Sequence, residues 1–245
     1  MKRIKLTVSY DGTNYCGWQV QPNGITVEEV LNKELSKILK EDIQVIGASR
    51  TDSGVHAKGN VAVFDTNARI PAEKICYALN AGLPSDIVVQ DSREVSPDFH
   101  PRRCVSVKTY EYKILNRTFP DPLLRNYVHF VYGTPDLKAM RQAASYLVGE
   151  HDFKSFCSVK TQVKETVRTI YSIDIEKQGD IITIRIKGSG FLYNMVRIIA
   201  GTLLEVGFAQ YPPQHVKDIL EARDRAAAGA TAPAKGLTLV GIEYD

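Results

Sequence analysis

One short segment brings most of the reactive side chains of this sequence close together. Gly47-Ala-Ser-Arg-Thr-Asp-Ser-Gly-Val-His-Ala57 places the carboxylate of Asp52 two residues after Arg50 and four before His56. The apolar run before it predicts a strand that ends in a Gly/Ser-rich turn, a rigid mount for one reactive side chain. An arginine at this spacing can pair with the carboxylate or bind an anionic substrate. The alternative is an ordinary turn aspartate that caps backbone N–H groups, and spacing alone favours it.

A second candidate is a pair of tyrosines on a predicted strand. The alternation of Thr109-Tyr-Glu-Tyr112 places Tyr110 and Tyr112 on one face of the strand and Glu111 on the other. A ring on such a face can stack on the flat surface of a base that has left its helix. By pattern alone, a core tyrosine with a satisfied hydroxyl is the better interpretation.

A third candidate is Arg197, which lies in the apolar helical stretch from Phe191 to Gly201. An arginine among apolar neighbours must extend its head to water or pair with a carboxylate. The sequence leaves both possibilities open: a partner for Asp52, or an arginine on the helix surface.

Six segments resemble motifs of a single family. Arg50-Thr-Asp-Ser-Gly-Val-His-Ala57 resembles the Arg-Thr-Asp-Ala-Gly-Val-His-Ala signature of the tRNA pseudouridine synthase A (TruA) family. The other segments that are similar to this family are Tyr15–Asn23, Lys108–Ile114, Leu147–Phe153, Gly190–Gly201 and Ala232–Leu237. They occur in family order along essentially the whole chain.

This resemblance implies a cofactor-free isomerase that converts uridines at positions 38, 39 and 40, in the anticodon arm of tRNA, to pseudouridine. It implies that Asp52 is the catalytic carboxylate and that Arg197 pairs with it across the two halves of the chain. Tyr110 corresponds to the pocket tyrosine that contacts the base, which leaves Tyr112 for packing. Arg50 is a candidate for entering the RNA stack and binding substrate. The working unit implied by the family is a homodimer, without metal or small-molecule cofactor.

Composition is compatible with this interpretation but does not name a partner. Apolar residues make up 44% and charged residues 24% of the 245 residues, as in globular proteins. A net charge of +3 permits RNA binding through local patches. No apolar run reaches the length of a membrane span, and the chain starts directly with a strand pattern, so a cytoplasmic protein without membrane contact is expected. Candidate phosphate contacts, none of them decisive alone, are Arg102, Arg103, Lys108, Lys154, Lys160, Lys164 and Arg168.

Metal and nucleotide motifs do not occur in the sequence. The four cysteines, at positions 16, 76, 104 and 157, have no metal-ligand spacing, which favours unpaired thiols over zinc or disulfides. There is no Walker loop, and Gly188-Ser-Gly190 lacks the third glycine of a dinucleotide-binding loop.

The order of the predicted elements indicates an α+β fold. Each half of the chain has the order strand-helix-strand-strand-helix-strand, which predicts two ferredoxin-like (RRM-like) halves. We expect a mixed, mainly antiparallel sheet with helices on one face and a catalytic cleft between the halves. The predicted domains are residues 1–100 and 101–245, with the seam at Ser96–Cys104, where prolines and charges interrupt the periodic pattern. Helices are predicted at Phe191–Val206 and Pro213–Ala222, and Arg223–Lys235 is expected to be a surface connection.

Two other classes of function remain possible from the residues. A non-enzymatic RNA-binding protein could use the same scaffold, although no stretch matches the Lys/Arg-Gly-Phe-Gly-Phe strand motif. In such a protein a pairing of Asp52 with Arg197 would serve no purpose. A hydrolase that uses Asp52 and His56 should act without RNA and should lose its activity when His56 is replaced by alanine.

Overall fold

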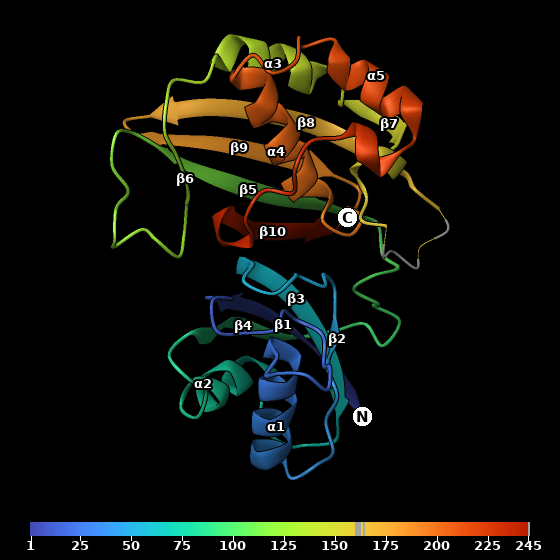
Figure 1. Cartoon of the computed structure of the whole chain (residues 1–245). Helices are drawn as coiled ribbons and strands as arrows, with labels where there is room; N and C mark the ends of the chain where they lie inside the picture. The colour runs from blue at the N-terminus through green and yellow to red at the C-terminus, as the bar shows by residue number, and fades with distance from the viewer. Residues whose placement is uncertain (160–162, 164, 245) are drawn as a thin grey trace. The chain divides into compact units, whose positions relative to one another are not determined.

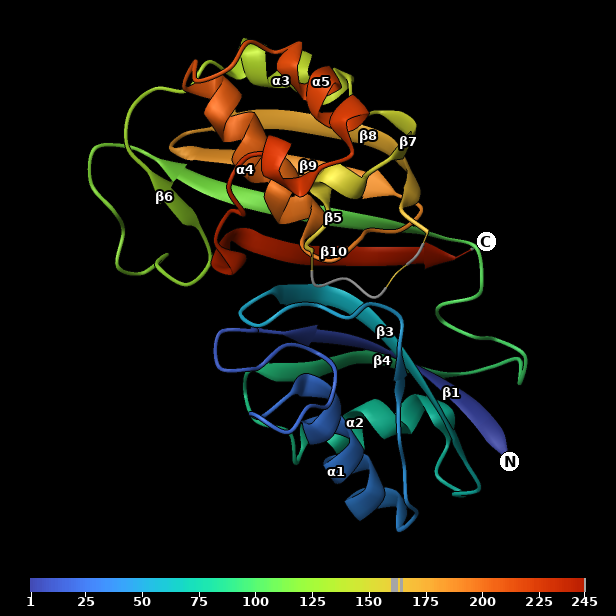
Figure 2. The same cartoon turned by 45° about the vertical axis from the view of Figure 1, so that its right-hand side comes forward.

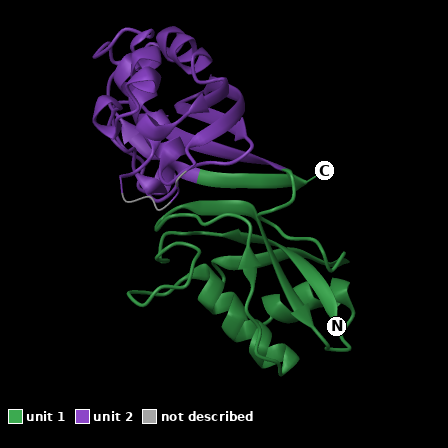
Figure 3. Ribbon diagram, turned by 90° about the vertical axis from the view of Figure 1, so that its right-hand side faces the viewer, with its two compact units in different colours: residues 1–105, 238–245 green, residues 106–237 purple. Residues whose placement is uncertain are grey.

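The computed structural model describes residues 1–159, 163 and 165–244. The chain forms two compact units: unit 1 comprises residues 1–105 and 238–245, and unit 2 comprises residues 106–237 (Figure 3). The sequence predicts domains of 1–100 and 101–245. The structure instead divides the chain after Val105 and groups its final strand with unit 1. No local pattern marks this grouping, because it results from pairing between segments far apart in the sequence.

Unit 1 contains a sheet with its two α-helices on the same side (Figure 2). Its elements are β1 (Lys2–Tyr10), α1 (Val27–Leu39), β2 (Ile46–Gly47), β3 (His56–Thr66), the 3-10 helix η1 (Ala72–Lys74), α2 (Ile75–Asn80), β4 (Ile87–Val95) and β10 (Leu237–Tyr244). The strand order is β4–β1–β3–β10, and β1 is antiparallel to both neighbours. The other edge of β3 pairs with β2 at residues 62–63 and, in parallel, with β10 at residues 56–57. The segment between β2 and β3 therefore leaves the sheet and returns to it within unit 1.

Helix α1 begins at the sequence Thr26-Val-Glu-Glu29, which has the form of a capping box with Thr26 as the N-cap. The Oγ1 atom of Thr26 accepts a hydrogen bond from Glu29 N (3.3 Å), which satisfies one of the unpaired N–H groups of the first turn. The helix ends at Leu39 and is followed by the C-cap Lys40, whose φ of 56° is left-handed. Its buried side chains, at intervals of four residues along one face, are Val27, Leu31, Leu35 and Leu39.

The strands of unit 2 also pair in sheet fashion, and helices α3, α4 and α5 lie on one side of them (Figures 1 and 2). Its elements are β5 (Ser106–Asn116), β6 (His129–Val131), α3 (Leu137–Ser145), β7 (Gly149–Asp152), η2 (Lys154–Phe156), β8 (Val167–Gln178), β9 (Ile181–Gly188), α4 (Met195–Gly207), α5 (His215–Ala222), η3 (Arg225–Ala227) and η4 (Ala234–Gly236). The strand order is β5–β9–β8–β7, antiparallel throughout, with β6 parallel to β5. Strands β8 and β9 form an antiparallel hairpin, with Gly179 at a φ of 57° in its turn.

Helix α4 starts later than predicted. The apolar pattern predicts a helix from Phe191, but the helix begins at Met195, after Asn194. The reason is the backbone of Asn194, whose φ of 62° is left-handed and cannot continue a right-handed helix. Nearly every side chain of α4 is buried, which explains why its sequence is apolar on all sides.

The segment 223–235 lies at the surface, as the sequence predicts, since nearly all of its residues are exposed or half-buried, but it is also held to helix α4. It lies along α4: Ala232 N donates to Arg197 O (3.1 Å), and Gly229 N donates to Thr202 Oγ1 (3.0 Å). Its small residues also let its backbone approach that of α4 closely.

The structure confirms the α+β class and the mixed, mainly antiparallel pairing of strands. The likeness of each half to a ferredoxin-like unit stays a prediction. Within the described part of the chain, none of the helices has the length and apolar character needed to cross a membrane.

The contact of α4 with segment 223–235 can be tested at Gly201. A Cβ atom at this position would lie 1.8 Å from Ala230 O, so alanine can enter only if the segment moves. We expect Gly201→Ala to lower the free energy of unfolding by about 1–3 kcal/mol, although alanine has the higher helix propensity. Thermal unfolding measures this. Gly241→Ala, where a Cβ meets nothing within 4 Å, is the control. A rise in melting temperature for Gly201→Ala would contradict the contact.

Candidate active site

The loop that carries Asp52 joins β2 to β3 in unit 1. It leaves the sheet at Ala48, whose N donates to Val61 O (2.7 Å). Val55 N donates to Asp52 O (3.1 Å) and closes a turn before β3 begins. Asp52 is half-buried, whereas Arg50 is exposed. The strand and turn expected around Asp52 are therefore present, although β2 is shorter than the predicted strand.

The loop between β1 and α1 packs closely against the Asp52 loop. Trp18 N donates to Thr51 O (3.0 Å), the carbonyl directly before Asp52. The preceding Gly17 has a φ of 86°, and a Cβ there would lie 2.5 Å from Thr51 O. A Cβ at Gly12 would lie 2.0 Å from the carbonyl oxygen of Val55. Only glycine permits both approaches. This packing explains why the segment Gly17-Trp18-Gln19 occurs in the same protein as the Asp52 segment.

His56 belongs to the same packed region. It is 5% exposed, its Nδ1 accepts a hydrogen bond from Gly12 N (3.0 Å), and the same atom lies 3.1 Å from Asp11 Oδ1. The hydrogen bond from Gly12 N holds the imidazole against the end of β1. They support a structural role for His56 and give no support to a hydrolase that uses it as a base.

Two buried polar residues beneath the loop are functional candidates that sequence reasoning missed. The hydroxyl of Tyr10 lies 2.7 Å from Thr51 Oγ1, and the side chain of Asn60 binds both backbone groups of Ser49. A signal was present: Asn60 is a polar amide at the head of the apolar run Val61-Ala-Val-Phe64. A buried amide in such a place needs partners, and here they are in the Asp52 loop.

In unit 2, strand β5 carries both tyrosines. Tyr110 is 7% exposed and meets the ring of Phe191 edge to face, with centroids 5.2 Å apart and planes at 82°. Tyr112 is completely buried and donates to Pro233 O (2.9 Å). Glu111, expected on the other face, forms an ion pair with Arg185 (2.5 Å). The contacts of Tyr112 support its predicted packing role, while the role of Tyr110 toward a base stays a prediction.

Arg197 is oriented by neighbours within unit 2. Its Nε donates to Ala232 O (2.8 Å) and its Nη1 to Asn194 Oδ1 (2.8 Å), and the residue is half-buried. Burial raises the pKa of the Tyr112 hydroxyl, and the positive charge of Arg197 opposes that rise in part. Arg197 lies in unit 2 and Asp52 in unit 1, and their pairing stays a prediction.

The candidate phosphate contacts are spread over both units. Arg102, Arg103 and Lys154 are exposed. Arg168 donates from Nη1 to Glu165 O (3.1 Å). Lys160 and Lys164 lie outside the described residues.

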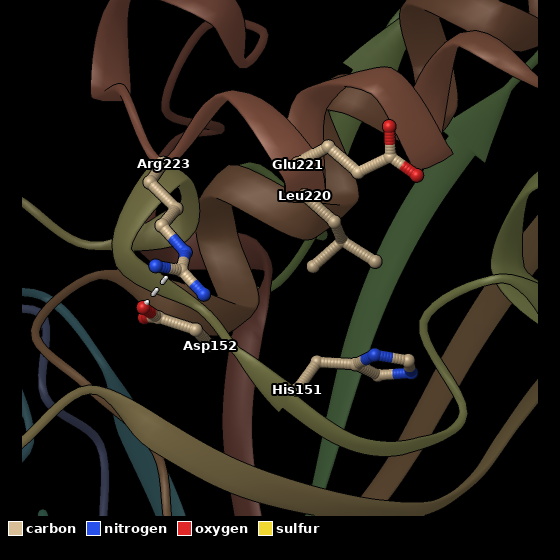
Figure 4. A pocket seen from close by; sticks show the side chains of 5 residues that line it. All are labelled: His151, Asp152, Leu220, Glu221 and Arg223. Carbon is tan, nitrogen blue, oxygen red and sulfur yellow. Dashed lines mark ion pairs between the residues drawn. The ribbon is translucent and has the colours of Figure 1, made fainter.

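A small pocket in unit 2 lies apart from all of the predicted site residues. Figure 4 shows its lining by His151, Asp152, Leu220, Glu221 and Arg223. Its main charges compensate each other, because Arg223 Nε lies 3.3 Å from Asp152 Oδ2. Across residues 1–159, 163 and 165–244, no three or more His, Cys, Asp or Glu side chains are grouped to hold a metal ion.

Known proteins resemble this chain along its whole length. A family model described as tRNA pseudouridine synthase matches residues 6–102 and 143–245. The chain is 50% identical over 244 residues to tRNA pseudouridine synthase A of Thermoanaerobacter sp. (strain X514), covering 100% of both chains. It is 49% identical over 244 residues to tRNA pseudouridine synthase A of Brevibacillus brevis, again with 100% of both covered.

A solved structure described as an archaeal box H/ACA sRNP Nop10-Cbf5 complex aligns with 96% of this chain and 46% of its own. Its sequence identity is 12% and its TM-score 0.33, too low to support a structural argument. The family model and the full-length relatives together show the family of this chain. The chain belongs to the tRNA pseudouridine synthase A family, whose members are isomerases.

Proposed function

We propose that this chain isomerises uridine to pseudouridine at positions 38, 39 and 40, in the anticodon arm of tRNA, with Asp52 as the catalytic carboxylate. The observation that carries the proposal is the combination of family membership with the fixed loop around Asp52. The backbone on both sides of this half-buried carboxylate is hydrogen-bonded, which is the mount that a reactive group requires.

The reaction needs few chemical groups. The bond between N1 and C1′ breaks, the base turns while it stays bound, and C5 bonds to C1′. A proton then leaves C5 and one is taken up at N1, so that the product is an isomer of the substrate. A carboxylate can serve in this sequence as nucleophile or as base. Asp52 is the group that we assign to this role.

Three other residues complete the proposed site. Arg197 keeps the Asp52 carboxylate ionised when the pocket excludes water. Tyr110 stacks on the uracil that leaves the RNA helix. Arg50, which is exposed, contacts RNA by stacking or by binding phosphate. The proposal includes a homodimer, because a symmetric pair offers more surface to a whole tRNA than one chain does, and a cytoplasmic location, because tRNA is the substrate.

Replacement of Asp52 tests the central assignment. Asp52→Asn keeps the shape of the side chain and removes the ionisable group. We expect pseudouridine formation on an unmodified tRNA transcript to fall by more than about 1,000-fold, with the dissociation constant for tRNA nearly unchanged. Asp42→Asn, at an exposed position of the same unit, is the control and should retain its activity. Turnover by Asp52→Asn, after contaminating wild-type enzyme is excluded, would refute the assignment. Mapping the product positions by primer extension tests positions 38, 39 and 40.

Two replacements separate the ring of Tyr110 from its hydroxyl. If the ring stacks on the base, Tyr110→Ala should lose about 1–3 kcal/mol of transition-state binding, and Tyr110→Phe should retain most of the single-turnover rate. Tyr112→Phe, which loses the hydrogen bond to Pro233 O, is the control for a buried hydroxyl and should affect stability only. Equal losses in Tyr110→Phe and Tyr110→Ala would assign the role to the hydroxyl instead.

The pH dependence of the rate tests Arg197. Loss of a neighbouring cation raises the pKa of a desolvated carboxylate, and the ionised form is the reactive one. Arg197→Ala should therefore lose activity and shift the acid limb of its pH–rate profile to higher pH, while Arg197→Lys should restore part of both. An arginine that only stabilises unit 2 predicts a lower melting temperature with an unshifted acid limb.

A further inference from the structure

A buried polar cluster lies beneath the Asp52 loop and has no part in the chemistry described above. It contains Asn60 on β3, Tyr10 at the end of β1, and Ser49 and Thr51 in the loop. We propose that Asn60 and Tyr10 are positioning residues, which fix the loop backbone so that the Asp52 carboxylate stays in its reactive place. This inference rests on the proposed function, because it assigns both residues a part in the reaction of Asp52.

The side chain of Asn60 takes the place of a strand partner. Ala48 N donates to the backbone of β3 at Val61 O (2.7 Å). One residue later, Ser49 N donates to Asn60 Oδ1 (3.3 Å), and Asn60 Nδ2 donates to Ser49 O (2.9 Å). The amide thus binds the N–H and the C=O of one residue, as a neighbouring strand would. The loop therefore has a fixed backbone at the point where it leaves the sheet.

The amide of Asn60 uses its full hydrogen-bonding capacity. Its Oδ1 also accepts from Val61 N (2.9 Å), and its Nδ2 also donates to Tyr10 OH (3.3 Å). An asparagine side chain offers two donors and an acceptor oxygen with two lone pairs, so these four bonds satisfy it. Asn60 is completely buried. If its amide were turned by 180°, its NH2 group would face the N–H groups of Ser49 and Val61 and could bond to neither. Only one orientation of the side chain fits, and it holds Ser49.

Tyr10 extends this support to the residue before Asp52. Its hydroxyl accepts from Asn60 and can donate its own proton to Thr51 Oγ1, 2.7 Å away. Both residues are buried, so water does not compete for the bond. Thr51 O accepts from Trp18 N, so that Thr51 is fixed at its side chain and at its carbonyl.

The residue after Asp52 is fixed as well. Ser53 Oγ donates to Tyr15 O (3.2 Å). A carboxylate between two fixed neighbours keeps its place, and a misplacement of about 1 Å at a reacting group can cost about 100-fold in rate. The cluster itself is buried, so that it acts on the reaction only through the loop.

A second asparagine, Asn80, provides a control that matches Asn60 in its hydrogen bonds, although its position is exposed. In the same unit, Asn80 Nδ2 donates to Val89 O (2.9 Å), and Val89 N donates to Asn80 Oδ1 (2.8 Å). This is the same two-bond contact with one backbone residue, but it joins α2 to β4 and is not part of the Asp52 loop.

The experiment compares Asn60→Ala, Tyr10→Phe and Asn80→Ala by single-turnover rate at saturating unmodified tRNA, dissociation constant for tRNA and melting temperature. We expect the rate to fall about 100-fold in Asn60→Ala and about 10-fold in Tyr10→Phe. The dissociation constant should stay within about threefold in both, and Asn80→Ala should keep its rate within about twofold. A rate loss in Asn80→Ala as large as that in Asn60→Ala would overturn the proposal, because it would reflect lost stability alone.

A double-mutant cycle isolates the bond between Tyr10 and Thr51. Thr51→Val removes the hydroxyl at nearly constant shape, and Thr51→Ser keeps it. If the bond positions Asp52, Tyr10→Phe and Thr51→Val should reduce the rate by similar factors, and the double variant should be no slower than the slower single variant. Thr51→Ser should stay close to wild type. This cycle decides the question even if Asn60→Ala fails to fold.

The two proposals fail in different ways. Turnover by Asp52→Asn would overturn the proposed function, and the positioning role with it. An inactive Asp52→Asn, together with wild-type rates in Tyr10→Phe, Thr51→Val and the double variant, would overturn the positioning role alone.

Discussion

The backbone of the Asp52 loop is held at its start by strand β3 and by the buried amide of Asn60. One edge of β3 pairs with β1, and the other pairs with β2 and β10, so the strand itself has little freedom. Asn60 transfers this rigidity to Ser49 by two hydrogen bonds to its backbone. A half-buried carboxylate can then stay in one place without being part of the sheet. Because the backbone of this loop is ordered when the chain folds, it does not have to be ordered again when substrate binds.

Close backbone contact is the second constraint, and it joins segments that are distant in the sequence. Gly12 and Gly17 let the loop after β1 approach the carbonyls of Val55 and Thr51. Each approach leaves no space for a side chain, so the two loops form one packed body. The same principle operates in unit 2, where Gly201 admits the backbone of Ala230 against helix α4. In both units, glycine is required because a neighbouring carbonyl leaves no space for a Cβ atom, and not because the chain needs a flexible linker there.

In unit 2, two adjacent carbonyls orient the side chains of Arg197 and Tyr112. Ala232 O accepts from Arg197 Nε, and Pro233 O accepts from the hydroxyl of Tyr112. Segment 223–235 therefore helps to set the direction of the guanidinium, and Asn194 binds it from a second side. An arginine with these partners is more ordered than one on an open helix surface, which suits the role that we propose for it.

The sequence by itself determined the family, the α+β class, the capped start of α1 and the segment that carries Asp52. These features have local patterns: a capping residue three positions before its partner, apolar spacing, and a continuous motif. Tertiary structure alone decided three others. The last strand belongs to unit 1. Helix α4 begins only at Met195, because the backbone of Asn194 is left-handed. The side chain of Asn60 binds the backbone of the Asp52 loop. The reason is that strand pairing, backbone approach and buried hydrogen bonds join residues far apart in the chain, and such contacts leave no periodic trace in the sequence.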